Sequence, residues 1–318
     1  MIRSLHPGPI PRDSWRRFVC HPDPDCLVSL AASFSEAGPA DAARLSRDFS
    51  EVVSSIRIGR THKLTRPNRL AGPTGALCDR LQSPARDTLQ FLDVGASDGI
   101  TTLEAVRMLE ARLERPVHAC LIDPFVRLVR YRSGSTVEYR TPDQSPVMVR
   151  VGSIGLQLSS LDTARDPLSR SLGRWYLSRT AARQSMPVDA TISLVNPLVA
   201  ADPSVTVLEW DVLRHDPALV DRFHAVRASN VLNHSYFSTE QIERTLSHLH
   251  GYLRDGGWLL VSRSRVSGSG EVDHGSIWRK EGVRFVRVHS FGAGAEIASL
   301  VDQFHQDPAP RAVEPLAT

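Results

Sequence analysis

The sequence has few cysteines and lacks a hydrophobic run long enough to cross a membrane. Its four cysteines, Cys20, Cys26, Cys78 and Cys120, include no C-x-x-C pair. We therefore expect reduced thiols and no bound metal. No segment approaches about 18 consecutive apolar residues, and the opening stretch MIRSLHPGPIPRDSW lacks the apolar core of a secretory signal. These absences predict a cytoplasmic location and no membrane partner.

The sequence also lacks a cluster of charge of one sign. Its formal net charge is +3, and the arginines that supply most of the positive charge are spread along the chain. A nucleic-acid surface needs basic residues gathered on one face, so no nucleic-acid partner is expected. The 318 residues are 41% hydrophobic, which suits a large globular domain with additions. Both a monomer and a homodimer remain open.

From residue 89 onward the chain contains alternating strand and helix patterns. An α/β fold with a mostly parallel seven-stranded sheet is predicted, because the first strands are nearly continuous apolar runs. The closing segment GSIWRKEGVRFVRVHSFG predicts an antiparallel last strand. A capping box at Ser238–Gln241 opens a helix with a buried stripe, which Gly256 and Gly257 are predicted to stop. The predicted strands are LQFLDVG, VHACLIDPF, VTVLEWDVL, FHAVRASNVLN and GWLLVSRS.

Additions flank and interrupt this core. Residues 1–88 form a predicted helical N-terminal cap, with two helices separated at Gly38-Pro39. Residues 89–305 form the predicted core domain. It carries an insert over 124–204, after the second strand, with a hairpin in TVEYRTPDQSPVMVRVG and an arginine-rich helical stretch. Inserts of this length are often lids or substrate walls. The tail, 306–318, is predicted to be disordered.

The turn in FLDVGASDGI narrows the choice of ligand. A dinucleotide site uses G-x-G-x-x-G so that the backbone can approach a pyrophosphate. Here Ser97 replaces the second glycine and Asp98 brings a carboxylate close to where phosphates would lie. A carboxylate repels phosphate, so the turn favours a positively charged ligand without phosphate. The alternative role for Asp98 is a helix N-cap or first-turn acid.

These segments together resemble the class I S-adenosylmethionine (SAM)-dependent methyltransferases. The resemblance rests on FLDVGASDG, the acidic strand end at Asp123, LEWDVL, VRASNVLNHSYF and LRDGGWLLVSR, and covers about residues 89–305. It implies the Rossmann-like fold of that class and SAM as methyl donor or as substrate. The segment NVLNHSYF also resembles the chemotaxis-receptor methyltransferases, without their substrate-recognition features.

The resemblance implies that the turn after the first strand holds the methionine part of SAM. Gly95, Ala96 and Ser97 would contact the ligand, since Gly95 allows a close backbone approach. Asp93, at the end of the strand, would bind the ligand's ammonium directly or through water.

The ends of the later strands are implied to hold the nucleoside and the sulfonium. Asp123 would accept both ribose hydroxyls. Asp211 would accept from the adenine amine, with Trp210 or Leu213 beside the ring. Asn230 would lie below the sulfonium and the aminobutyrate chain.

Three groups are candidates to face the sulfonium. The first follows the fourth strand and contains Asn230, Asn233, His234 and Tyr236. The second is Trp175-Tyr176 in the insert, and the third is Tyr131 or Tyr139 near the hairpin. Aromatic faces attract cations, and histidine is a common general base, which makes His234 a candidate. The alternatives are ordinary packing for the aromatic residues and a surface position for His234. From these groups, Asn230, Tyr176, His234 and Tyr236 are the predicted catalytic residues.

Three functions remain open at this point. The first is methyl transfer to a small-molecule acceptor in a closed site, consistent with the absence of an N/D-P-P-Y/F motif after the fourth strand. The second is attack of SAM's own α-amine on its γ-carbon, as in the bacterial azetidine-2-carboxylate synthases of secondary metabolism. The chain resembles these in size, N-terminal cap and insert. The third is a SAM-binding module without turnover.

Overall fold

A computed structural model describes residues 23–59, 61–63, 65–81, 87–152, 154–159, 161, 167–180, 186–267 and 270–306. The irregular N-terminus and most of the disordered tail predicted from the sequence lie outside these residues. The chain divides into two compact units. The first unit comprises Met1–Arg69, Ala96–Glu104 and Asp123–Glu209, and the second comprises Leu70–Gly95, Ala105–Ile122 and Trp210–Thr318. The domain boundaries expected from the sequence remain a prediction.

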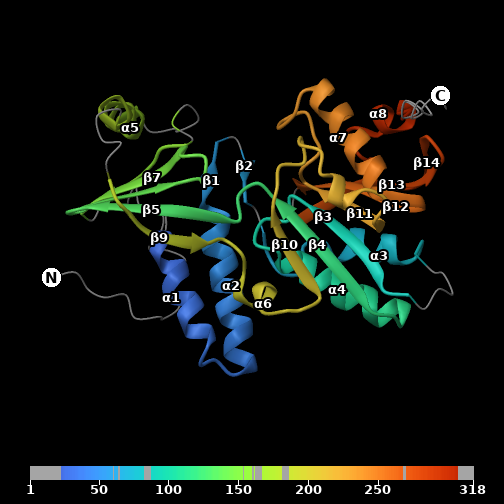
Figure 1. Cartoon of the computed structure of the whole chain (residues 1–318), viewed down its shortest axis with the longest axis horizontal. Coiled ribbons are helices and arrows are strands. Elements are labelled where there is room, and N and C mark those ends of the chain that lie inside the picture. Colours follow the sequence, from blue (N-terminus) through green and yellow to red (C-terminus); the bar gives the residue numbers. More distant parts are fainter. Residues whose placement is uncertain are drawn as a thin grey trace, which may run out of the picture. The chain divides into compact units, whose positions relative to one another are not determined.

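A seven-stranded sheet of order β10-β4-β3-β11-β12-β13-β14 carries the βα alternation (Figure 1). β3 pairs in parallel with β4 and with β11, and β11 pairs in parallel with β12. β13 pairs antiparallel with β12 and with the last strand, β14. The predicted α/β fold with a mostly parallel sheet is thereby confirmed. The strands are β3 (Leu89–Val94), β4 (Val117–Asp123), β10 (Val205–Glu209), β11 (Phe223–Ser229), β12 (Leu253–Ser267), β13 (Gly270–Glu281) and β14 (Arg284–Phe291).

Helices lie on both faces of the second unit's strands, with α3 and α7 on opposite sides (Figure 1). Burial on both faces explains why five of the six residues of β3 are buried. Besides α5 (Pro167–Thr180), which belongs to the first unit, the helices described after the N-terminal region are α3 (Ala71–Cys78), α4 (Ile100–Leu113), α6 (Pro197–Ala200), η3 (Pro217–Leu219), α7 (Thr239–Tyr252) and α8 (Ala298–Gln303).

α7 begins as predicted and ends earlier than predicted. Ser238 and Gln241 form the capping box, with the Ser238 side chain accepting from the Gln241 N–H. The helix ends at Tyr252, so the predicted stop at Gly256 and Gly257 is wrong. Those glycines lie inside β12. Gly257 lacks room for a side chain because its Cβ would lie 2.8 Å from the carbonyl oxygen of Arg254.

The first unit contains a five-stranded sheet of order β8-β7-β6-β5-β9, in which neighbouring strands are antiparallel. The predicted hairpin is confirmed as β6 and β7, and part of the arginine-rich stretch forms α5 (Pro167–Thr180). The pairing of β5 with β9, which joins residues as far apart in the chain as Arg127 and Ser193, was not predicted. The strands are β5 (Arg127–Ser133), β6 (Thr136–Arg140), β7 (Pro146–Val151), β8 (Ile154–Gln157) and β9 (Val188–Ser193).

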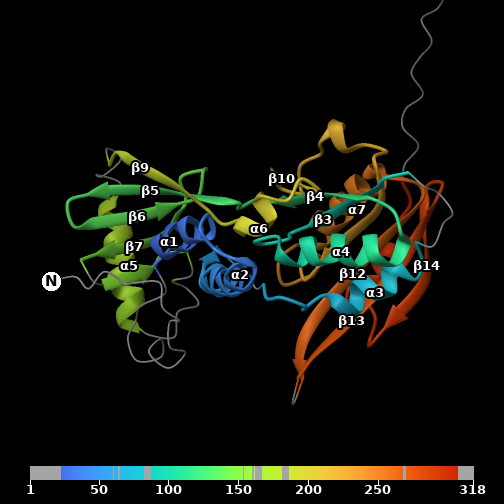
Figure 2. The same cartoon turned by 90° about the horizontal axis from the view of Figure 1, so that it is seen from below.

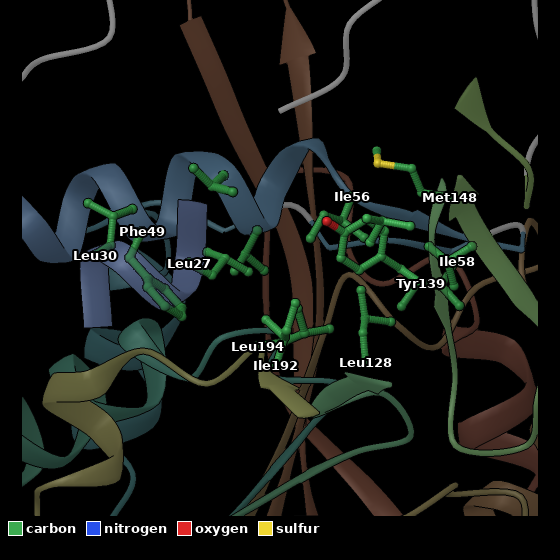
Figure 3. Close-up of a cluster of buried hydrophobic side chains, with 14 of the residues drawn as sticks. Leu27, Leu30, Phe49, Ile56, Ile58, Leu128, Tyr139, Met148, Ile192 and Leu194 are labelled. Atoms are coloured by element: carbon green, nitrogen blue, oxygen red, sulfur yellow. The ribbon is translucent and has the colours of Figure 1, made fainter. Parts of the chain in front are cut away.

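Two N-terminal helices pack against this sheet (Figure 2). α1 (Asp25–Phe34) and α2 (Pro39–Ser55) are separated at Gly38-Pro39 as predicted. A short hairpin of β1 (Arg57–Ile58) and β2 (Thr61–His62) follows. Side chains from α1, α2, β1 and four strands of the five-stranded sheet share one hydrophobic core, which includes Phe49, Leu128 and Ile192 (Figure 3). The N-terminal helices are therefore part of the first unit's core.

The cysteines in the described residues, Cys26, Cys78 and Cys120, carry free thiols, as expected; Cys20 lies outside those residues. Burial raises the pKa of the Cys120 thiol to about 11, so this thiol stays protonated and unreactive at neutral pH. No helix in the described ranges is long and apolar enough to span a membrane.

Candidate functional site

The turn after β3 requires glycine at position 95. Gly95 has φ +68°, and a Cβ built there would lie 2.9 Å from a methyl carbon of Val231. Its N–H donates to the carbonyl of Ile122. A side chain is excluded both by the backbone conformation and by the lack of space. Glycine is required here for packing against Val231, and the predicted contact of Gly95 with a ligand remains a prediction.

Ser97 in the same turn is held in a left-handed conformation that non-glycine residues rarely adopt. Its φ is +62°, and only 7% of its surface is exposed. Its hydroxyl donates to the carbonyl of Lys63, and its N–H donates to Asp123 Oδ2 at 3.0 Å. Such strain persists where surrounding contacts fix the residue, and it is common at ligand sites.

The carboxylate of Asp123 lies directly against this turn. Besides the Ser97 N–H, it accepts from the Phe125 N–H at 2.8 Å and from the Lys63 ammonium at 2.8 Å, both on Oδ1. The side chains of Lys63 and Asp123 are 1% and 8% exposed. The structure thus brings together Ser97 and Asp123, which the sequence placed at one site. It adds Lys63, which the sequence did not indicate.

Asp98 is a buried structural residue. Its carboxylate is fully buried and accepts from the side chains of Ser50 and Thr65 and from the Ile100 N–H at the start of α4. Asn196 Nδ2 lies at 3.5 Å. Burial raises the pKa of Asp98, and these donors oppose that rise. The expectation that Asp98 presents a charge to the ligand is wrong, and the alternative of an N-capping acid fits.

Asp93 has a protein partner where a ligand's ammonium was expected. Both of its carboxylate oxygens accept from the Arg227 guanidinium, at 2.9 and 2.5 Å. Arg227 also donates to the Thr74 hydroxyl at 2.8 Å, and all three side chains are buried. A carboxylate in a bidentate pair with arginine is already neutralised. Asp93 therefore does not present a free negative charge in this structure.

Trp210 and Asp211, which directly follow β10, are half-buried. Trp210 donates from its indole N–H to the carbonyl of Arg214, whose guanidinium lies 5.0 Å from the centre of the Trp210 ring. Asp211 accepts from the Leu213 N–H at 2.9 Å. The roles predicted for Trp210 and Asp211 beside adenine remain predictions.

The loop after β11 is fixed by its own polar contacts. Asn230 has φ +62°, and its Oδ1 accepts from the Ser264 N–H at 2.8 Å. Asn233 is buried and donates to the carbonyl of Val231. His234 is exposed and Tyr236 half-buried. The loop therefore gathers three of the predicted catalytic residues, Asn230, His234 and Tyr236, on one short segment.

An ion-pair network supports that loop. Glu296 accepts from the His234 N–H at 3.1 Å and pairs with Arg263 and Arg265. Partial burial raises the pKa of Glu296, and these hydrogen bonds and positive charges outweigh it, so the pKa lies below its usual value. Glu296 is thus ionised at neutral pH and anchors the loop.

Tyr176, the fourth predicted catalytic residue, lies in a second, smaller buried cluster of the first unit. Its hydroxyl donates to Glu138 at 2.8 Å, and the ring packs against Val149 and Leu158. The neighbouring Trp175 is 53% exposed, with the Arg179 guanidinium 4.5 Å from its ring centre. A catalytic role for Tyr176 would require the hydrogen bond to Glu138 to break.

Tyr131 and Tyr139 also have protein partners. The Tyr131 hydroxyl donates to Gln144 at 2.8 Å, and the Tyr139 hydroxyl donates to Asp23. Both rings are buried in the first unit. Their contacts fit the packing alternative for these aromatic residues. In the described part of the chain no group of three or more His, Cys, Asp or Glu side chains could hold a metal ion.

No protein-family profile and no curated protein sequence matches this chain. Solved structures give weak likenesses. One is the citrinin polyketide synthase CMeT domain, at 16% identity over 58% of this chain and 31% of that chain, with a TM-score of 0.28. Another is the [4+2]-cyclase SpnF, at 14% identity over 62% and 46%, with a TM-score of 0.29.

A third is phosphoethanolamine N-methyltransferase 2 of Haemonchus contortus, solved in complex with SAM. It shares 14% identity over 62% of this chain and 29% of that chain, with a TM-score of 0.28. The chain spans less than half the length of each of these three. Likenesses at this level carry no inference about activity, and the α/β class follows from the strand order itself.

Proposed function

We propose that this chain is a SAM-dependent enzyme that transfers the methyl group of SAM to a small-molecule acceptor. The observation that carries the proposal is the contact between Asp123 and Ser97. The acid that ends β4 accepts from the backbone of the turn after β3 at 3.0 Å. An acid at a strand end beside such a turn suits the hydroxyls of a ribose.

The properties of SAM fit this turn better than those of a dinucleotide. The glycine pattern that lets the backbone approach a pyrophosphate is absent. SAM carries a sulfonium and no phosphate. The predicted contacts of Ala96 with the methionine part, of Trp210 and Asp211 with adenine, and of Asn230 below the sulfonium belong to this proposal.

Methyl transfer needs little from the protein beyond placement. The acceptor's lone pair forms a bond to the methyl carbon, the carbon–sulfur bond breaks, and its electron pair stays on sulfur to give S-adenosylhomocysteine. The acceptor's proton passes to a base or to water. The loop with Asn230, His234 and Tyr236 is fixed by Ser264 and Glu296, so it can hold an acceptor in one position. His234 is the proposed base.

A second candidate function is cyclisation of SAM, with which the Arg227–Asp93 ion pair is compatible. In this reaction the neutral α-amine attacks the γ-carbon, the γ-carbon–sulfur bond breaks, and its electrons stay on the sulfur of methylthioadenosine. The ring nitrogen of azetidine-2-carboxylate keeps its protons as an ammonium. A free carboxylate beside the amine would keep it protonated. Because Arg227 already neutralises Asp93, that obstacle is absent at this position.

Incubation of the purified protein with SAM alone, followed by mass spectrometry, separates the candidates. Methyl transfer predicts no turnover until an acceptor is added from a panel of small amines, phenols and carboxylates, and then S-adenosylhomocysteine. Cyclisation predicts methylthioadenosine without any acceptor. Binding of SAM with no product under either condition would indicate a binding module. Failure to bind SAM would refute the proposal.

A further inference from the structure

The N-terminal segment contributes a buried lysine to the proposed nucleoside end of the site. Lys63 follows the β1–β2 hairpin, and its ammonium lies 2.8 Å from Asp123 Oδ1 and 3.5 Å from the carbonyl oxygen of Ser97. Its own carbonyl accepts from the Ser97 hydroxyl at 3.2 Å. Lys63 is 2% exposed. A lysine this deeply buried is uncommon without a partner, and its described hydrogen bonds join it to Ser97 and Asp123 of the proposed site.

The contacts of Asp123 are unequal between its two oxygens. Oδ1 accepts from Lys63 and from the Phe125 N–H, whereas Oδ2 accepts from the Ser97 N–H alone among the described contacts. Each carboxylate oxygen accepts about two hydrogen bonds. Oδ1 is therefore saturated, and Oδ2 retains capacity for one more donor.

We propose that Lys63 is a positioning residue that makes Asp123 an acceptor for one ribose hydroxyl. This inference rests on the proposed use of SAM. Lys63 fixes the carboxylate against the turn and occupies the oxygen that a second hydroxyl would otherwise use. The two hydroxyls of the ribose are then recognised unequally, in contrast to the sequence-based expectation that Asp123 accepts from both.

The test compares ligands that lack one hydroxyl at a time. S-adenosylhomocysteine and its 2′-deoxy and 3′-deoxy analogues are titrated into the wild-type protein by calorimetry. Loss of the hydroxyl bound by Asp123 Oδ2 should weaken binding about tenfold or more, since the acceptor is charged. Loss of the other should weaken it less than about threefold. Equal losses for the two analogues would overturn the inference.

Variants of Lys63 then test whether this residue causes the unequal recognition of the two ribose hydroxyls. Lys63→Met frees Asp123 Oδ1 for a second hydroxyl. In this variant the 2′-deoxy and 3′-deoxy analogues should therefore bind more weakly than S-adenosylhomocysteine by similar factors, whereas in Lys63→Arg the two factors should stay unequal. A Lys63→Met protein that keeps the wild-type inequality would contradict the positioning role. If Lys63→Met fails to fold, Lys63→Arg and the wild-type titrations decide.

A control lysine separates positioning from stability. Lys280 donates to the carbonyls of His250 and Leu253 in the second unit, so Lys280→Met should reduce stability and leave the ratio between analogues unchanged. A wild-type protein that binds none of the three ligands would refute the proposed function, and this inference with it. Binding without inequality would refute the inference alone.

Discussion

Arg227 on β11 and Asp93 on β3 form a two-contact ion pair at the centre of the seven-stranded sheet. The N–O distances are 2.9 and 2.5 Å, and the side chains are 0% and 3% exposed. The two strands are parallel neighbours, with Arg227 opposite Asp93 in the register. The pair therefore fixes the end of β3, from which the proposed SAM turn begins.

Arg227→Met should strongly destabilise the protein. Removing one partner of a buried ion pair costs about 3–5 kcal/mol, because the remaining charge stays buried without that partner. Urea denaturation measures the free energy of unfolding. The exposed pair Arg112–Asp79 supplies the control, because Arg112→Met should cost less than about 1 kcal/mol. Similar losses for the two variants would contradict a buried-charge role for Arg227.

Replacing both members of the buried pair should cost less than replacing one. In Asp93→Leu/Arg227→Met no charge is left buried, so stability should recover part of the loss seen in Arg227→Met. A double-mutant cycle of unfolding free energies measures this coupling. Additive losses would show that the two side chains act independently.

Gly95→Ala should abolish SAM binding. The added Cβ requires an unfavourable backbone at φ +68° and lies 2.9 Å from Val231, so the turn must move. Gly251→Ala, in α7 with no atom within 4 Å of the built Cβ, should be neutral or stabilise by up to about 1 kcal/mol. Calorimetric titration with SAM and thermal unfolding check both variants. Unchanged SAM affinity in Gly95→Ala would place the ligand elsewhere.

Asp98 should make folding stability depend on pH. Burial raises its folded-state pKa above the unfolded value, so the folded protein binds a proton more readily than the unfolded chain. The contribution of Asp98 to stability is then largest below the unfolded pKa and is lost as the pH rises through the folded pKa. Relative to Asp98→Asn, the wild type should gain stability as the pH falls from neutral toward about 4.

Urea denaturation of both proteins at matched pH values measures that difference. The groups that face the Asp98 carboxylate, Ser50, Thr65, Asn196 and the Ile100 N–H, do not titrate in this range. A constant difference between the two proteins across the range would contradict the raised pKa.

The local parts of the fold were predictable from the sequence. The strand at Leu89–Val94, the break at Gly38-Pro39 and the capping box at Ser238–Gln241 all depend on residues close in the chain, where apolar spacing and capping chemistry are informative. The end of α7 was missed because paired glycines such as Gly256 and Gly257 are typical of helix ends, whereas here they lie inside β12.

Partners far apart in the chain were not predictable in the same way. Lys63 and Asp123 are 60 residues apart, and Asp98 and Asn196 are 98 residues apart; no periodicity encodes such pairings. Arg227 gave a partial signal, since an arginine inside the apolar strand FHAVRAS needs a buried partner. Its pairing with Asp93 depended on the strand order.

Asp123→Asn should weaken binding of S-adenosylhomocysteine by about tenfold or more, because a charged acceptor is replaced by a neutral amide. In Asp123→Asn the buried Lys63 ammonium loses its carboxylate partner, which can destabilise the protein. Lys63→Met/Asp123→Asn carries no such charge, and its thermal stability, compared with that of Asp123→Asn, shows whether weakened binding reflects unfolding. Wild-type affinity in a folded Asp123→Asn protein would contradict the placement of the ribose.

The most direct measurement is a calorimetric titration of the wild-type protein with SAM and, separately, with NAD⁺. The proposed SAM site predicts saturable binding of SAM at one site per chain and no binding of NAD⁺, because the turn lacks the glycines for a pyrophosphate. Binding of NAD⁺ without binding of SAM would contradict it.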